Sequence, residues 1–129
     1  MSARQRAVIA ASLVSIVFAV PHVVEDFEEG LAARVGLTTP ALACLLGVFL
    51  AVQVLGLIFV AAGRRSGWAI TVAVGVIWVV GAFIEHGRAL AAGSFRSGAP
   101  SVVWVLGLVF AQAAAAIIAW SELHRRQRG

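Results

Sequence analysis

Four long apolar runs limit what this chain can fold into more than any other feature of the sequence. They cover residues 7–24, 41–62, 68–84 and 101–120. Each is close to the roughly 20 residues that an α-helix needs to cross a bilayer, where a helix satisfies every backbone N–H and C=O internally. The chain is also 61% hydrophobic and only 12% charged, whereas about a quarter of a soluble domain is charged. We therefore predict an all-α integral membrane protein, a four-helix bundle that forms a single transmembrane domain over residues 1–129.

The ends of the predicted helices follow from turn-forming residues. The first helix is expected to continue through the acidic stretch at its end to about Ala33. Thr39 and Pro40 are then interpreted as the N-cap and first residue of the second helix, because proline is favoured at the first helical position. A short turn at 63–67 and a longer polar loop at 88–99 complete the connections.

All of the Lys and Arg side chains are arginines, and they lie at the ends of the apolar runs. On one side of the predicted membrane are Arg4, Arg6, Arg64, Arg65, Arg125, Arg126 and Arg128, and on the other are Arg34, Arg88 and Arg96. Because positive charge is retained on the cytoplasmic side, both termini are predicted to be cytoplasmic. The first run is interpreted as a transmembrane helix rather than a cleaved signal peptide, since no soluble domain follows it. The short arginine-only loops favour a bacterial inner membrane, and the net charge of +4 requires no nucleic-acid partner.

A shift of the chain by 60 residues against itself, without a gap, aligns residue types that are rare in this sequence. The matched pairs include Arg4 with Arg64, Glu25 with Glu85, Asp26 with His86, Pro40 with Pro100 and Arg65 with Arg125. We predict two tandem helical hairpins, residues 7–63 and 67–123, related by duplication and followed by a basic cytoplasmic tail at 124–129. The alternative is that the biased composition produces these matches by chance. Both hairpins begin on the same side, so the repeats are parallel and their axis would run along the membrane normal. That symmetry would place Glu25 and Glu85 at the same depth on facing helices.

Polar residues gather where the first and third apolar runs end. On one stripe of the first helix, at i, i+3, i+4 and i+7, lie His22, Glu25, Asp26 and Glu29. Glu85 and His86 end the third run. We predict a catalytic or binding site where these stretches meet, with Glu25 or Glu85 as the acid or base. His22 and His86 would be its partners, and Asp26 lies beside them.

The same five side chains offer two further interpretations. Two imidazoles with several carboxylates suit a divalent metal ion of borderline character, such as zinc, manganese or iron. The sequence does not indicate whether a metal or any other cofactor is present. Alternatively, the charged residues form a solvated rim at the membrane surface, where Glu25 pairs with Arg88 and Glu85 with Arg34.

Several single residues in the apolar runs have individual predicted roles. Gln53 and Gln112 lie near mid-membrane, where an unpaired amide costs several kcal/mol, so we expect helix–helix hydrogen bonds or, alternatively, a polar path. The lone Cys44 excludes an intrachain disulfide and is expected to serve packing. Trp68 and Trp120 are expected to anchor the inner membrane interface.

Small residues at four-residue spacing predict close helix packing, because they allow two backbones to approach. Alternatively, such residues only fill a side of the helix that faces lipid. They are Gly107, Ala111, Ala115 and Ala119 in the fourth run, with Gly47 and Ala51 in the second.

Three functions fit these patterns. The first is an accessory or scaffold subunit, as a homo-oligomer or in a larger membrane complex, that binds a partner or lipid. The second is a membrane-embedded enzyme or binder of an apolar small molecule of the terpenoid, sterol or quinone class, acting through Glu25 or Glu85. The third is a proton-coupled or ion transporter along Gln53 and Gln112. A flat rim in which Arg34 and Arg88 pair with the acids would favour the first function. A deep pocket lined by His22, Glu25 and Glu85 would favour the second, and a continuous polar path from Gln53 or Gln112 the third.

Overall fold

The chain folds into four long helices and one short one. The computed structural model describes residues 1–95 and 97–125. The long helices are α1 (Ala3–Glu28), α3 (Thr39–Ala61), α4 (Arg65–Ala92) and α5 (Ala99–Arg125), and the short one is α2 (Leu31–Arg34). Each long helix has a window of mean hydropathy between 2.2 and 2.7 and is long enough to cross a membrane. The predicted all-helical architecture with four long apolar helices is confirmed.

Three of the arginines used to predict the orientation lie outside the described residues. They are Arg96, on the side predicted to face outward, and Arg126 and Arg128, in the tail predicted at 124–129. Of that tail, His124 and Arg125 are described, and both belong to the last turn of α5.

The helix ends differ from the predicted ones at three places. The first helix stops at Glu28 instead of about Ala33, because Gly30 takes a left-handed conformation with φ 77° and separates α1 from α2. Thr38, not Thr39, is the N-cap of α3, and its side chain accepts a hydrogen bond from the backbone N–H of Ala41. In the third case α4 continues to Ala92, through part of the predicted loop at 88–99.

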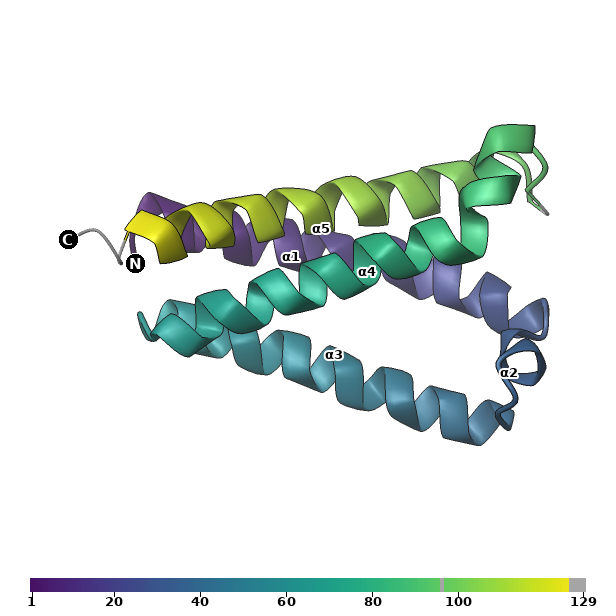
Figure 1. Ribbon diagram of the computed structural model, residues 1–129, viewed down its shortest axis with the longest axis horizontal. Coiled ribbons are helices and arrows are strands. Elements are labelled where there is room, and N and C mark those ends of the chain that lie inside the picture. The colour runs from purple at the N-terminus through teal and green to yellow at the C-terminus, as the bar shows by residue number, and fades with distance from the viewer. Residues whose placement is uncertain (96, 126–129) are drawn as a thin grey trace.

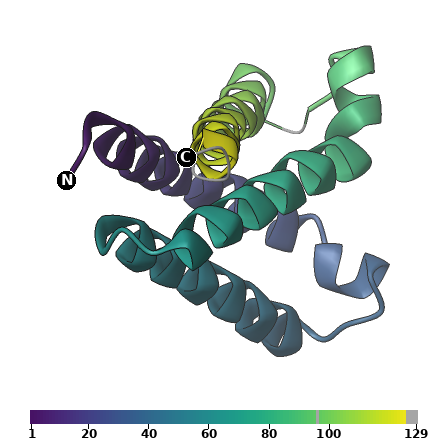
Figure 2. The ribbon, with the colours of Figure 1, turned by 60° about the vertical axis from the view of Figure 1, so that its left-hand side comes forward.

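The four long helices form a bundle in which α1 and α4 lie diagonally. Helix α5 packs against both α1 and α4, while α3 packs mainly against α4 and more sparsely against α1. The start of α1 and the end of α5 lie at the same end of the bundle (Figure 1). From that end α3 and α4 diverge toward α2, as both ribbon views show (Figures 1 and 2). The bundle is therefore tight around α5 and looser between α3 and its neighbours.

A buried cluster of side chains holds the four long helices together at one end of the bundle. Val8, Leu57, Val60, Trp68 and Ala119 form a buried cluster from all four long helices. The expectation that Trp68 anchors the membrane interface is wrong, because this side chain is fully buried in that cluster, whereas Trp120 is exposed.

Small residues mark the closest helix crossings. A Cβ on Gly67 would collide with backbone atoms of Phe59 and Val60 in α3. A Cβ on Gly75 would lie 2.8 Å from the Cβ of Ala116 and 2.9 Å from the carbonyl oxygen of Gln112 in α5. Such contacts are the ones that membrane helices use to associate.

The predicted small-residue seams have two different outcomes. On α5, Ala115 and Ala119 are fully buried, and the ring of Phe18 packs directly against Gly107. On α3, Gly47 and Ala51 are exposed. Cys44, expected to serve packing, is exposed on the same helix.

The mid-bundle amides form hydrogen bonds between helices. Gln53 donates to Ser12 Oγ at 2.9 Å, and Gln112 donates to Ser15 Oγ at 2.7 Å. The indole N–H of Trp78 donates to Gln53 Oε1 at 3.0 Å. These contacts join α1, α3, α4 and α5 in one buried polar layer, as the helix–helix interpretation predicted.

Candidate functional site

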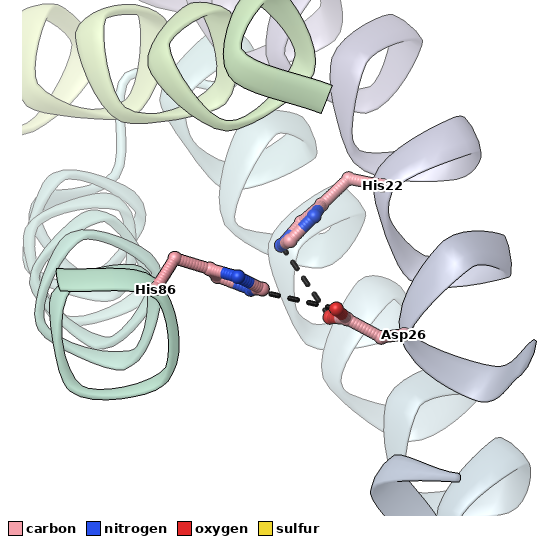
Figure 3. A group of neighbouring side chains, drawn as sticks. All are labelled: His22, Asp26 and His86. Carbon is pink, nitrogen blue, oxygen red and sulfur yellow. Dashed lines mark ion pairs between the residues drawn. The ribbon is translucent and has the colours of Figure 1, made fainter. Parts of the chain in front are cut away.

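A buried cluster of two histidines and an aspartate lies between α1 and α4. His22 and Asp26 are one helical turn apart on α1, and His86 reaches toward them from α4 (Figure 3). The three residues are 4%, 6% and 9% exposed, respectively. We call these three residues the His–Asp–His cluster.

Local sequence explains how these side chains meet. The i, i+4 spacing of His22 and Asp26 places them on the same face of α1. Because α4 continues without interruption past Glu85, it carries His86 to the level of that face. The ring of Phe95 stacks on the ring of His86, with centroids 6.0 Å apart and planes 21° from parallel.

The members of the cluster converge without forming standard hydrogen bonds to one another. His22 Nε2 lies 3.5 Å from Asp26 Oδ2, and His86 Nε2 lies 3.4 Å from Asp26 Oδ1. Both distances exceed the 2.7–3.2 Å of ordinary N–H···O hydrogen bonds. The buried Nε2 of His86 has no hydrogen-bond partner among the described residues. The two imidazole rings meet edge to face with centroids 4.6 Å apart.

The His–Asp–His cluster forms one wall of a cavity of about 300 Å³, which we call the main cavity. Its other walls are mostly apolar side chains of α3 and α4. The lining residues are His22, Asp26, Leu31, Leu46, Phe49, Ile77, Trp78, Gly81, Ala82, Glu85 and His86.

An entirely apolar side cavity of about 160 Å³ adjoins the main cavity. Leu46 and Trp78 line both cavities, and the remaining lining residues of the side cavity come from α1 and α3. The two cavities together occupy the part of the bundle where α3 diverges from its neighbours.

Glu85 lies on the wall of the main cavity and forms an ion pair with Arg34 of α2. The side chains of Glu85 and Arg34 are 32% and 43% exposed, so the pair is partly open to the surroundings of the bundle. This is the partner that the rim interpretation predicted for Glu85. The ion pair ties α2 to α4, two elements far apart in the sequence.

Glu25 points away from the main cavity and toward α5. Its Oε1 accepts hydrogen bonds from Ser97 Oγ and Ser101 Oγ, each at 2.6 Å. Ser101 is in the first turn of α5, where a carboxylate is favoured by the helix dipole. The predicted pairing with Arg88 is not among the described ion pairs of Glu25, and the structure does not bring Glu25 to face Glu85. The contact with Ser97 and Ser101 was not found from the sequence.

Sequence reasoning also missed a charged cluster at the opposite end of the bundle. Glu122, near the end of the predicted second hairpin, is 3% exposed. It accepts hydrogen bonds from Arg125 at 2.7 Å and from Arg4 at 3.4 Å. The second contact joins the start of α1 to the end of α5, so this cluster fastens the two ends of the chain.

No protein-family model, curated protein or solved structure matches this chain. The function is therefore argued from the site itself.

Proposed function

We propose that this protein spans a bacterial inner membrane four times and binds an apolar small molecule in the main cavity. The helix lengths and hydropathies support the membrane assignment. So does the surface of the bundle, which carries many exposed Val, Leu, Ile and Phe side chains. An apolar surface of this extent is stable next to lipid and unfavourable next to water.

The distribution of arginines supports an orientation with both termini in the cytoplasm. Among the described residues, the end with the termini carries Arg4, Arg6, Arg64, Arg65 and Arg125, whereas Arg34 and Arg88 belong to the other end. The positive-inside rule then directs the main cavity toward the outer side of the membrane. The tandem duplication of residues 7–63 and 67–123 belongs to the same proposal, and its support is the constant 60-residue frame.

The observation that carries the binding proposal is the composition of the main cavity. Its walls are apolar except for one polar end, formed by the His–Asp–His cluster and Glu85. Ligand sites commonly combine an apolar lining with a few convergent polar groups that fix orientation. The adjoining side cavity is apolar and lies along α1 and α3, so it extends the same space toward the lipid.

This shape fits a molecule with a polar head and a hydrocarbon body, of the quinone, sterol or terpenoid class. The head, a carbonyl or hydroxyl, would lie at His22, Asp26 and His86. The hydrocarbon body would lie against Leu46 and Trp78. If the bound molecule is transformed, the imidazoles and Glu85 are the groups within the cavity that can transfer a proton, whereas Glu25 is held by α5.

The other two functions have weaker support. An accessory subunit is favoured by the exposed small residues of α3, Gly47 and Ala51, where a partner helix could approach closely. A transporter needs a polar path through the bundle, but the side chains of Gln53 and Gln112 are bonded to Ser12 and Ser15 in a buried layer.

Filling the main cavity tests the binding proposal. A Cβ on Gly81 would meet nothing within 4 Å, so Gly81→Leu places a side chain at the cavity wall without a backbone clash. Gly47→Leu is the matched control, because Gly47 also has open space around it but does not line either cavity. Both proteins would be purified from their own membranes and their organic extracts compared with that of the wild type by mass spectrometry.

We expect an apolar molecule to copurify with the wild type and with Gly47→Leu, and to fall at least tenfold in Gly81→Leu. Equal amounts in both variants, or no discrete molecule with the wild type, would contradict the proposal.

A further inference from the structure

We propose that His22, Asp26 and His86 bind one divalent transition-metal ion, with Zn²⁺ and Fe²⁺ the best matches to the ligand atoms. The inference deepens the proposed function, on which the location of the ion beside a ligand cavity depends. The binding of the ion itself depends only on the geometry and charge of the cluster.

The spacing of the ligand atoms supports a common metal centre. Metal–nitrogen and metal–oxygen bonds of about 2.0–2.2 Å at tetrahedral angles place two ligand atoms about 3.3 Å apart. The nitrogen–oxygen distances are close to this value, at 3.4 Å from His86 Nε2 to Asp26 Oδ1 and 3.5 Å from His22 Nε2 to Asp26 Oδ2, so each imidazole faces a different oxygen of the carboxylate. One ligand atom from each of the three residues lies within 4.8 Å of the other two. These are poor distances for hydrogen bonds and suitable distances for ligands that share one ion.

The charge of the cluster also favours a cation. Asp26 is a nearly fully buried carboxylate, and a buried charge is costly unless it is paired. Its ion-pair partners in the described part of the chain are His22 and His86, which carry charge only when protonated. Arg34, on the neighbouring helix α2, is paired with Glu85 instead. A divalent ion would neutralise Asp26 and give the buried Nε2 of His86 a partner.

The ligand set indicates which ions fit. Two imidazole nitrogens and one carboxylate oxygen suit zinc and ferrous iron better than calcium or magnesium, which prefer oxygen ligands alone. Three protein ligands leave a coordination position free. All three ligands line the main cavity, so that position faces the space proposed for the small molecule. There the ion would polarise a carbonyl or hydroxyl head as a Lewis acid.

Cobalt binding measures the site directly. The protein would carry no histidine tag, be stripped with a chelator in detergent, and be titrated with Co²⁺ while visible absorption is recorded. Zn²⁺ would then displace the Co²⁺. We expect one equivalent of Co²⁺ to bind, with the absorption of a low-coordinate nitrogen–oxygen site, and stoichiometric loss of that absorption on addition of Zn²⁺.

Three single variants assign the ligands. Asp26→Asn and His86→Gln should each weaken Co²⁺ binding by at least about 100-fold, since loss of an outer partner alone costs 10–100-fold. His124→Gln is the control, because His124 lies at the opposite end of the bundle against Trp120. Thermal unfolding checks that every variant is folded. Zn²⁺ should raise the Tm of the wild type and of His124→Gln, but not of Asp26→Asn or His86→Gln.

The absence of stoichiometric Co²⁺ binding by folded wild type would overturn the inference, as would unchanged binding in Asp26→Asn. Gly81→Leu separates this result from the proposed function, because it should lose the small molecule and keep the metal. If the metal test fails while Gly81→Leu still releases a copurifying molecule, the cavity proposal stands and the cluster only orients a polar head.

Discussion

At the scale of single residues, two neighbours on α1 have different contacts, and these contacts determine which of them belongs to the site. Glu25 and Asp26 are adjacent in sequence, but a helix turns about 100° per residue, so they face different elements. The sequence predicted the stripe that holds both, and its 60-residue frame paired Asp26 with His86. It could not predict that Glu25 faces α5, because that depends on where α5 lies around α1. The two hydroxyl donors to Glu25 lie in the predicted loop (Ser97) and at the start of the fourth apolar run (Ser101), and neither position indicates a carboxylate partner.

Glu25→Ala should destabilise the protein without removing a ligand. The change takes the acceptor away from the hydroxyls of Ser97 and Ser101, so we expect the free energy of unfolding to fall by about 1–3 kcal/mol. The measurement is unfolding of the purified protein in a denaturing detergent, with Co²⁺ affinity recorded in parallel. Normal stability combined with loss of the copurifying molecule would instead make Glu25 a member of the site.

At the scale of helices, hydropathy predicted the long elements well and their ends less well. An apolar run of membrane length favours a helix, because a helix satisfies its backbone hydrogen bonds internally, and all four runs are helical in the structure. The break at Gly30 and the extension of α4 to Ala92 depend on local backbone conformation and on packing by residues such as Phe95. Hydropathy also carries no information on which face of a helix approaches another. The seam on α5 was therefore predicted correctly while the similar residues of α3 are exposed.

Two glycines on α4 should respond in opposite ways to the same small change. Gly75→Ala forces a Cβ to within 3 Å of α5, so we expect a loss of about 1–3 kcal/mol in unfolding free energy. Gly81→Ala enters open space, and the better helix propensity of alanine should leave stability unchanged or raise it by up to about 1 kcal/mol. Detergent-induced unfolding followed by circular dichroism compares the two. Equal effects would show that the α4–α5 crossing is not held by this contact.

At the scale of the whole molecule, the bundle is uneven, and the cavities lie in its looser part. The predicted duplication aligns α1 with α4 and α3 with α5. Helix α5 packs closely on both of its neighbours, whereas α3 packs less extensively on α4 and only sparsely on α1. If the hairpins share an origin, the first has opened relative to the second, and the main cavity occupies the opening. A sequence frame cannot predict such a departure from symmetry, since the residues that line the opening are ordinary apolar ones.

The central claim for the whole molecule is that the four long helices cross the membrane with the main cavity toward the outside. Two exposed serines at opposite ends of the bundle allow a direct test. Ser66 lies in the first turn of α4, and Ser94 follows the end of α4. Each would be changed to cysteine in a Cys44→Ser background, and spheroplasts would be treated with a membrane-impermeant maleimide.

Labelling of the two cysteines before and after permeabilisation is the measurement that tests this claim most directly. We expect Ser94→Cys to be labelled in intact spheroplasts and Ser66→Cys to be labelled only after permeabilisation. Labelling of Ser66→Cys alone in intact spheroplasts would place the cavity on the cytoplasmic side, and equal labelling of both would contradict a transmembrane bundle.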